Sequence, residues 1–264
     1  MSTDSIPASA PARVLCLSGH DPGGGAGIHA DIEAVAAQGA HALTVITALT
    51  VQDTRNVRRV APVPVTLMVE QIEALLADGA IAALKIGLLG AVDQIAPLAS
   101  LAARLRVPVV LDPVLRAGGG AELAESGLQQ ALLDVLLPRV SLLTPNAAEA
   151  RRLAPQAATL EQAARTLLAS GCGGVLITGG DEPDGAVINT LHRPDSAPRS
   201  WTWPRLPETF HGAGCTLAAA VAARLACGDA PEQAVEIAQA WTQRALARAR
   251  TVGRGRRIPG RSGP

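Results

Sequence analysis

Aromatic side chains are scarce in this chain. Its 264 residues include no tyrosine, one phenylalanine and three tryptophans, so aromatics make up 2% of the sequence while hydrophobic residues make up 48%. The core must therefore be aliphatic. A net charge is also lacking, because 23 basic residues balance 23 acidic ones. Without an overall field to hold a polyanion, we expect no nucleic-acid partner and a small-molecule ligand instead.

Paired cysteine motifs and long apolar runs are missing too. The four cysteines show no C-x-x-C spacing, so neither a disulfide framework nor a zinc site is indicated. No apolar run approaches the ~20 residues that a membrane span needs, and residues 1–12 do not resemble a secretory leader. We therefore expect reduced thiols, a cytoplasmic protein and no membrane partner.

The length fits one large α/β domain, which we place at residues 13–250 because no linker-like break interrupts the periodic region. Residues 1–12 are predicted to form a disordered N-terminal tail. Residues 251–264 are basic, rich in glycine and proline, and without a periodic apolar face. We predict a disordered basic C-terminal tail there.

Short apolar runs alternate with stripes of helical spacing along the domain. This alternation predicts right-handed βαβ units and an α/β fold with a mostly parallel sheet covered on both faces. Near Gly179 the pattern changes, and residues 186–191 are expected to pair with 200–203 as an antiparallel edge. The predicted strands include 14–17, 45–50, 83–86, 108–111, 141–143 and 175–178, and the predicted helices 28–36, 65–76, 95–105, 122–137, 146–154, 159–170, 214–227 and 231–249.

Residues 211–216, His-Gly-Ala-Gly-Cys-Thr, lead directly into an alanine-rich helix. Two glycines let the backbone approach a ligand, and the first turn of a helix carries unpaired N–H groups that favour an anion. A thiol at this terminus, here Cys215, is expected to have its pKa lowered toward the thiolate. The alternative is a tightly packed core helix in which Cys215 is an apolar filler.

Residues 18–27 form a glycine-rich turn after the first strand. The pattern Gly25-x-Gly27-x-x-Ala30 formally matches a dinucleotide fingerprint and would suggest a dehydrogenase. That fingerprint requires an acidic residue ~20 positions later. Residues 45–50, Val-Ile-Thr-Ala-Leu-Thr, contain none. We therefore set the dehydrogenase interpretation aside.

Polar residues follow the ends of the predicted strands, where open α/β sheets bind their ligands. Asp112 either caps a turn or serves the site. Asn146 and Glu149 are spaced to cap the next helix, and equally to hold a hydrated magnesium ion through its waters. The other polar residues or glycines at strand ends are Gln52, Lys85 to Gly87, and Gly179 with Gly180.

The order and spacing of these blocks resemble the hydroxymethylpyrimidine/phosphomethylpyrimidine kinases of thiamine biosynthesis, within the ribokinase-like superfamily. The Asp-Pro-x-Gly-Gly-Ala-Gly-Ile block from Asp21 and the Gly-x-Gly-Cys-Thr block from Gly212 together are typical of this branch. The resemblance extends over residues 14 to about 225. The blocks that carry it are residues 18–31, 45–54, 84–89, 111–114, 143–149 and 211–216.

The resemblance implies a three-layer α/β/α kinase domain and a homodimer. It implies ATP and Mg²⁺ as cofactors and phosphorylation of 4-amino-5-hydroxymethyl-2-methylpyrimidine, then of the monophosphate. By similarity, Cys215 is catalytic in the anion hole of Gly212, Ala213 and Gly214, and Asp112 and Glu149 serve the metal. The pyrimidine contacts implied are Gly19, Asp31, Gln52, Leu88 and Val114, and the ATP contacts are Lys85, Asn146, Thr178, Gly179 and Gly180.

Some positions depart from the family pattern. Thr178 stands where many relatives have lysine before Gly-Gly, and His20, Leu88 and Asp53 replace the commoner serine or threonine, methionine and asparagine. Two other interpretations remain open at this point. One is a pyridoxal-type or dual vitamin kinase on the same fold, and the other is a non-catalytic vitamin-binding regulator that retains the pocket.

Overall fold

The computed structural model describes residues 10–114, 127–183 and 185–262. Within them one nine-stranded sheet runs through the molecule in the order β3-β2-β1-β4-β5-β6-β7-β8-β9. The central strands β2, β1, β4, β5, β6 and β7 run parallel to one another. At one edge β3 pairs antiparallel with β2, and at the other β8 pairs antiparallel with both β7 and β9. The strands are β1 (Arg13–His20), β2 (His41–Gln52), β3 (Val57–Pro62), β4 (Ala83–Ile86), β5 (Val109–Leu111), β6 (Leu142–Leu143), β7 (Val175–Ile177), β8 (Val187–His192) and β9 (Arg199–Trp203).

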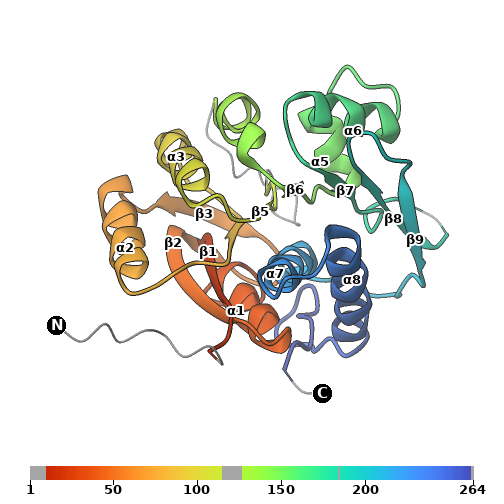
Figure 1. The fold of residues 1–264 in the computed structure, drawn as a ribbon. Helices are drawn as coiled ribbons and strands as arrows, with labels where there is room; N and C mark the ends of the chain where they lie inside the picture. The colour runs from red at the N-terminus through yellow and green to blue at the C-terminus, as the bar shows by residue number, and fades with distance from the viewer. Residues whose placement is uncertain (1–9, 115–126, 184, 263–264) are drawn as a thin grey trace.

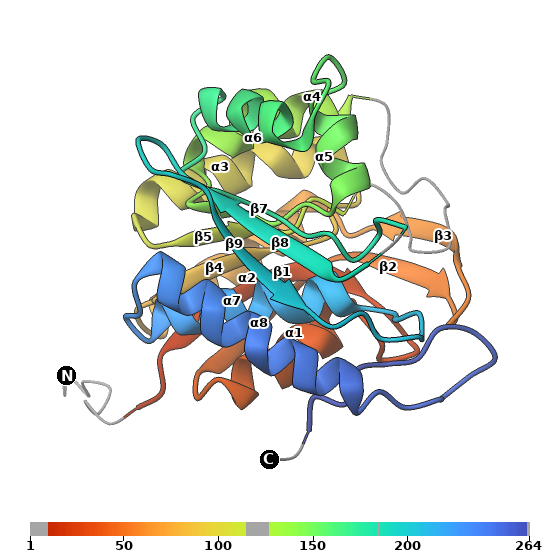
Figure 2. The same ribbon diagram turned by 90° about the vertical axis from the view of Figure 1, so that its right-hand side faces the viewer.

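Helices cover both faces of the sheet and give three layers (Figures 1 and 2). One face carries α1 (Gly27–Ala37), α7 (Ala213–Ala226) and α8 (Pro231–Ala247). The other carries α2 (Val65–Ala77), η1 (Val92–Gln94), α3 (Ile95–Leu105), α4 (Leu128–Ala131), η2 (Leu132–Leu136), η3 (Leu137–Arg139), α5 (Ala147–Leu153) and α6 (Leu160–Ala169). The α/β/α fold predicted from the sequence is confirmed.

The two cores follow from the period-two alternation of the strands. In β1, Leu15 and Leu17 pack into the core on the α2 and α3 side, while Val14 and Cys16 pack into the core with α1 and α7. All four side chains are fully buried. Helix α7 lies in the middle of its layer, and residues 216–223, mostly alanine, are all buried because small side chains let the helix approach the sheet and α8 closely.

The predicted antiparallel edge at residues 186–203 is confirmed by β8 and β9. A second antiparallel edge was not predicted: β3 pairs with β2 after the tight turn at residues 53–56, where Asp53 accepts hydrogen bonds from the backbone of Arg55 and Asn56. The helix predicted over 122–137 is described only from residue 128, because residues 115–126 lie outside the described part.

The C-terminal segment differs from its prediction as a disordered tail over 251–264. Through residue 262 it runs back from α8 along the α1 side of the molecule (Figure 2). It forms bridges between Phe210 and Arg257 and between Arg250 and Ile258. Arg261 is buried and donates to the Gly25 carbonyl oxygen. The tail prediction is therefore wrong for residues 251–262, while residues 1–9 and 263–264 lie outside the described residues.

No helix in the described ranges combines the length and apolar character required to cross a membrane.

Candidate active site

A cavity of about 670 Å³ opens at the carboxyl ends of the parallel strands. Its wall includes Gly19 near the end of β1, Gln52 at the end of β2, and Asp112 directly after β5. Asn146 and Thr178 follow β6 and β7 and join through a short parallel bridge. Because parallel strands end at one edge of the sheet, residues far apart in the sequence meet here. Leu88, Val114 and Gly180 also line this cavity.

The N-terminus of α7 forms the floor of the cavity. Gly212 has φ +83°, and a Cβ there would overlap the Gly25 carbonyl oxygen, so only glycine fits. This close contact joins the glycine-rich turn to the start of α7. The next residues, Ala213, Gly214 and Cys215, line the cavity with the first turn of the helix, whose N–H groups have no intrahelical partner. Free N–H groups at a helix N-terminus favour an anion, and an anion hole at residues 212–215 stays a prediction.

Asp21 shapes the glycine-rich turn. Its two carboxylate oxygens accept backbone hydrogen bonds from Gly23, Gly25 and Ala26 at 2.8, 2.9 and 2.9 Å. Its Oδ2 also lies 2.8 Å from His211 Nε2, just before the anion hole. Although burial alone would raise the pKa of Asp21, these hydrogen bonds lower it. Asp21 was part of the sequence block but was not singled out as a site residue.

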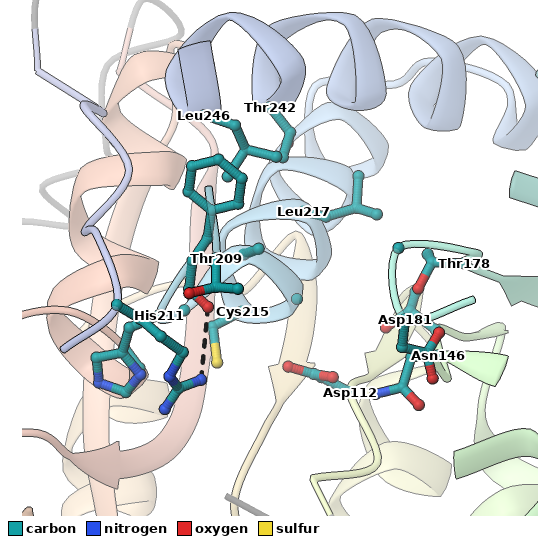
Figure 3. A pocket seen from close by; sticks show the side chains of 18 of the residues that line it. Asp112, Asn146, Thr178, Asp181, Thr209, His211, Cys215, Leu217, Thr242 and Leu246 are labelled. Carbon is teal, nitrogen blue, oxygen red and sulfur yellow. Dashed lines mark hydrogen bonds between the residues drawn. The ribbon is translucent and has the colours of Figure 1, made fainter. Parts of the chain in front are cut away.

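Cys215 and Asp112 face each other across the floor (Figure 3). Burial, reinforced by the Asp112 carboxylate, raises the pKa of the Cys215 thiol to about 12, against the opposing charge of Lys85. The prediction of a lowered pKa at Cys215 is therefore wrong. A helix terminus supplies roughly 0.3–1 kcal/mol, which is less than the desolvation of a buried thiolate. The thiol is neutral near pH 7.

Among the carboxyl groups near Cys215, Asp112 has the strongest effect on the thiol. Burial raises the pKa of this carboxyl, whereas Lys85 and a hydrogen bond from the Cys215 thiol lower it. Its Oδ2 is buried without a hydrogen-bond partner. An unpartnered buried carboxylate oxygen on the wall of a cavity is the donor that a hard cation such as Mg²⁺ prefers.

Lys85 and Asp31 are not on the cavity wall, in contrast to their predicted contacts with ATP and pyrimidine. Both side chains are fully buried, and Lys85 Nζ lies 2.8 Å from Asp31 Oδ1 and 2.8 Å from Ser18 Oγ. Burial would lower the pKa of Lys85, but Asp31 first, then Cys215 and Asp112, raise it. Since a buried charge needs a partner, the two residues satisfy each other beneath the floor. Lys85 remains a cation and acts on the site through its charge.

Asn146 and Glu149 form a complete capping box at the start of α5. Asn146 Oδ1 accepts from the Glu149 backbone at 2.8 Å, and Glu149 Oε2 accepts from the Asn146 backbone at 3.0 Å. Both residues also line the cavity, so the capping and ligand interpretations are compatible. Within the described ranges no group of three or more His, Cys, Asp or Glu residues could hold a metal ion. A cation here would therefore rely on Asp112, Glu149, water and the ligand itself.

The half of the cavity farther from Gln52 lies between α8, the carboxyl end of β7 and the start of β8. Gln239 Oε1 accepts from Asn189 Nδ2 at 2.7 Å and from Trp203 Nε1 at 3.1 Å, which orients the amide. Gln239 Nε2 and Thr242 Oγ1 are buried without partners, and both residues line the cavity. Gly179, predicted to contact ATP, instead donates its N–H to Asn189 and is not on the wall. Gln239 and Thr242 were not predicted, because the sequence of α8 shows only an apolar stripe.

Most of the chain matches one family of known proteins. The phosphomethylpyrimidine kinase family model matches residues 21–259. The hydroxymethylpyrimidine/phosphomethylpyrimidine kinase of Escherichia coli is 39% identical over 248 residues, covering 91% of this chain and 92% of its own length. The chain belongs to the phosphomethylpyrimidine kinase family. It is therefore a phosphotransferase, and the family predicted from the sequence is confirmed.

Other relatives are similar over the same region. The thiamine biosynthesis bifunctional protein ThiED of Geobacter sulfurreducens is 37% identical over 248 residues, and the chain spans 50% of its length. Among solved structures, pyridoxal kinase from Staphylococcus aureus in complex with pyridoxal superimposes with a TM-score of 0.86 at 27% identity, covering 95% of this chain and 93% of its own. Phosphomethylpyrimidine kinase from Clostridium difficile gives a TM-score of 0.77 at 27% identity, covering 89% and 99%.

Proposed function

We propose that this phosphomethylpyrimidine kinase family member transfers the γ-phosphoryl group of ATP to 4-amino-5-hydroxymethyl-2-methylpyrimidine, and then transfers a second to the resulting monophosphate. One observation carries the proposal. A single cavity joins Gln52 on one side to Gln239 and Thr242 on the other, and the amides of residues 213–215 lie between them. The acceptor and donor of a phosphoryl group must meet in line at such a point.

ATP fits the far half of the cavity. The unpartnered Gln239 Nε2 and Thr242 Oγ1 offer hydrogen bonds to the edge of a nucleobase, and Leu217 and Leu246 supply apolar walls (Figure 3). A structure of Bacillus subtilis pyridoxal kinase, 27% identical, contains ADP. We propose that Asn146, Thr178 and Gly180 lie along the phosphates, since they line the cavity between these two groups and Asp112.

The residues present fit Mg²⁺. Asp112 has a buried oxygen without a partner, and Glu149 shares the wall with it. Mg²⁺ is typically held by one or two carboxylates, waters and the phosphates of the substrate. Bound there, the ion would neutralise charge on the transferring phosphoryl group. The chain itself would orient both substrates, and the amides of α7 would stabilise negative charge on the transferred group.

Gln52 supports the pyrimidine as acceptor. Its Nε2 donates to Thr50 Oγ1 at 2.7 Å, and Thr50 Oγ1 in turn donates to the His20 carbonyl oxygen at 2.8 Å, so the amide has a set orientation. An amide presents one donor edge and one acceptor, which complement the amino group and ring nitrogen of an aminopyrimidine. Gly19 and Leu88 complete this end of the cavity.

The test is direct. The purified chain is incubated with ATP, with and without MgCl₂, and with the hydroxymethylpyrimidine, and products are followed by mass spectrometry. We expect the monophosphate to appear first and then the diphosphate, both only with magnesium. Pyridoxal is assayed in parallel, because pyridoxal kinases are close structural neighbours. Preferred formation of pyridoxal phosphate would replace the proposal with the pyridoxal kinase alternative, and binding without any product would favour the regulator.

We also propose a homodimer. Leu49 and Val51 are two residues apart on one face of β2 and are 51% and 42% exposed, so together they offer an apolar surface that a second copy of the chain would cover. Light scattering at micromolar concentration should give twice the mass of the 26.9 kDa chain; a monomer mass would contradict this. The cytoplasmic location stays a prediction of the sequence.

A further inference from the structure

The C-terminal segment lies between the turn after β2 and the segment that precedes α7. On one side Arg256 N donates to the Thr54 carbonyl oxygen at 3.0 Å and Gly255 N donates to Thr54 Oγ1 at 2.9 Å. On the other side Arg257 N donates to the Thr209 carbonyl oxygen at 3.0 Å. A Cβ at position 255 would overlap the Thr54 backbone, so glycine is required for this close approach. Backbone contacts on both sides therefore hold Arg256 in place.

These contacts place Arg256 at a specific point of the site. Thr54 lies two residues after Gln52, where we place the pyrimidine. Thr209 lies three residues before Gly212, where the anion hole begins. Arg256 is bonded between these two segments and lines the same cavity. The Arg256 side chain therefore lies between the proposed pyrimidine site and the proposed anion hole.

The guanidinium is incompletely satisfied. Arg256 Nη1 donates to the Phe210 carbonyl oxygen at 3.4 Å, a long contact, and Nε is buried without a partner. Burial lowers the pKa of this guanidinium while the Asp21 carboxylate raises it. In the described part of the chain no carboxylate lies within ion-pair distance of Arg256. A cation with open donors on a cavity wall suits an anionic ligand group.

We propose that Arg256 binds the phosphate of the phosphorylated pyrimidine and so favours the second phosphoryl transfer. The inference rests on the proposed function. A phosphate attached to the hydroxymethyl group of a pyrimidine at Gln52 extends toward the anion hole, and so passes the junction that Arg256 lines. The unphosphorylated substrate has a neutral hydroxyl there. A guanidinium forms paired, charge-assisted hydrogen bonds with a phosphate, so the charge acts on the monophosphate far more than on the alcohol.

The experiment compares R256Q, R256K and the matched control R254Q. Arg254 is exposed in the same segment, and its replacement removes the same charge outside the cavity. Steady-state kcat/KM is measured separately for the hydroxymethylpyrimidine and for its monophosphate. Calorimetry without ATP measures the Kd of the monophosphate for each variant, which is a readout independent of turnover.

We expect R256Q to lower kcat/KM for the monophosphate at least ~10 times more than for the alcohol, and to weaken monophosphate binding by a similar factor. R256K keeps the positive charge but not the paired N–H donors of the guanidinium, and should recover part of the lost kcat/KM and part of the lost monophosphate affinity. R254Q should match the wild type. Equal losses on both substrates, or no loss on either, would overturn the assignment. If the wild type phosphorylates neither pyrimidine, the proposed function fails instead, and the calorimetric comparison still decides the role of Arg256.

Discussion

Burial reverses the pKa shift that the local motif around Cys215 suggests. The residue stands in the first turn of α7, where dipole and amides favour a thiolate, but the side chain is packed beside Asp112 and above the Lys85 and Asp31 pair. Removing a thiolate from water costs more than the helix terminus returns. We therefore expect the Cys215 side chain to act in the proposed reaction as a neutral hydrogen-bond donor rather than as a thiolate.

We predict slow alkylation of Cys215. With a pKa of about 12, its thiolate fraction at pH 8 is smaller by roughly three orders of magnitude than that of an ordinary thiol. Iodoacetamide should therefore modify the exposed Cys227 first, and modification of Cys215 should accelerate as the pH rises toward 12. Peptide mass spectrometry against time measures both rates in one sample. Equal rates at pH 8 would mean that the thiolate does form.

Gln52 is the residue at which pyrimidine and pyridoxal specificity should separate. Gln52→Met keeps the volume but removes both amide groups, and should weaken use of the hydroxymethylpyrimidine by ~1–3 kcal/mol, the usual cost of leaving a buried partner unpaired. Use of pyridoxal, which lacks the aminopyrimidine edge, should fall much less. The readout is kcat/KM for both substrates, with Asp53→Asn in the adjacent exposed turn as the control. A parallel loss for both substrates would assign Gln52 to loop structure.

The glycine-rich turn after β1 is an element organised by a single side chain. Asp21 accepts three backbone hydrogen bonds within the turn. Its Oδ2 also lies 2.8 Å from Nε2 of His211, which precedes the proposed anion hole. Three glycines in a row have little intrinsic order, so the carboxylate supplies the conformation that the local sequence does not.

Asp21→Asn should lower the free energy of unfolding by ~2 kcal/mol at pH 7, because charge-assisted hydrogen bonds are worth ~1.5–3 kcal/mol. The folded pKa of Asp21 lies below its unfolded value. Its stabilisation is therefore present above the unfolded value, about pH 4, and is lost as the pH falls through the lower folded value. Urea unfolding of both proteins from pH 7 to pH 3 should show the difference shrinking. Asp78→Asn, at a 79% exposed carboxylate, should cost under ~1 kcal/mol.

At the scale of the whole molecule, the C-terminal segment ties together parts of the site that are far apart in the chain. Arg261 Nε donates to Thr216 Oγ1 in α7 at 2.8 Å, and Nη1 lies 3.0 Å from Glu33 Oε2 in α1. Its Nη2 donates to Gly25 in the glycine-rich turn. One buried guanidinium thus connects the turn, the anion-hole helix and α1.

Arg261→Met should lower the free energy of unfolding by ~1–3 kcal/mol, since the Gly25 carbonyl oxygen and Thr216 Oγ1 lose a buried donor, while the half-exposed Glu33 is solvated by water. It should also lower kcat, because α7 and the glycine-rich turn lose a shared contact. Urea unfolding followed by tryptophan fluorescence gives the first value and steady-state kinetics the second. Arg104→Met, which breaks only the exposed pair with Glu73, should cost under ~1 kcal/mol. A loss at Arg261 no greater than at Arg104 would mean that the segment is not coupled to the site.

The elements that were predicted correctly are those whose pattern repeats locally. Helix α2 shows its apolar stripe within 13 residues, and α8 begins at Pro231 as expected for a proline in a first turn. Strand β3 was missed because its residues, including Arg58 and Arg59, are partly exposed at an edge and carry no apolar run. Its position depends on pairing with β2, which a local pattern does not record.

The sequence by itself determined the α/β class and the family, because periodicity and motif spacing are local properties of the chain. It also determined that Gln52, Asp112 and Asn146 lie near the 212–215 loop, because parallel strands of this fold class end at one edge of the sheet. Tertiary structure alone decided that Lys85 and Asp31 neutralise each other below the floor, that the Cys215 thiol stays protonated, and that residues 251–262 are ordered. Burial and charge pairing depend on neighbours far along the chain. Arg261 and Gly25, for example, are 236 residues apart in sequence and in direct contact in the fold.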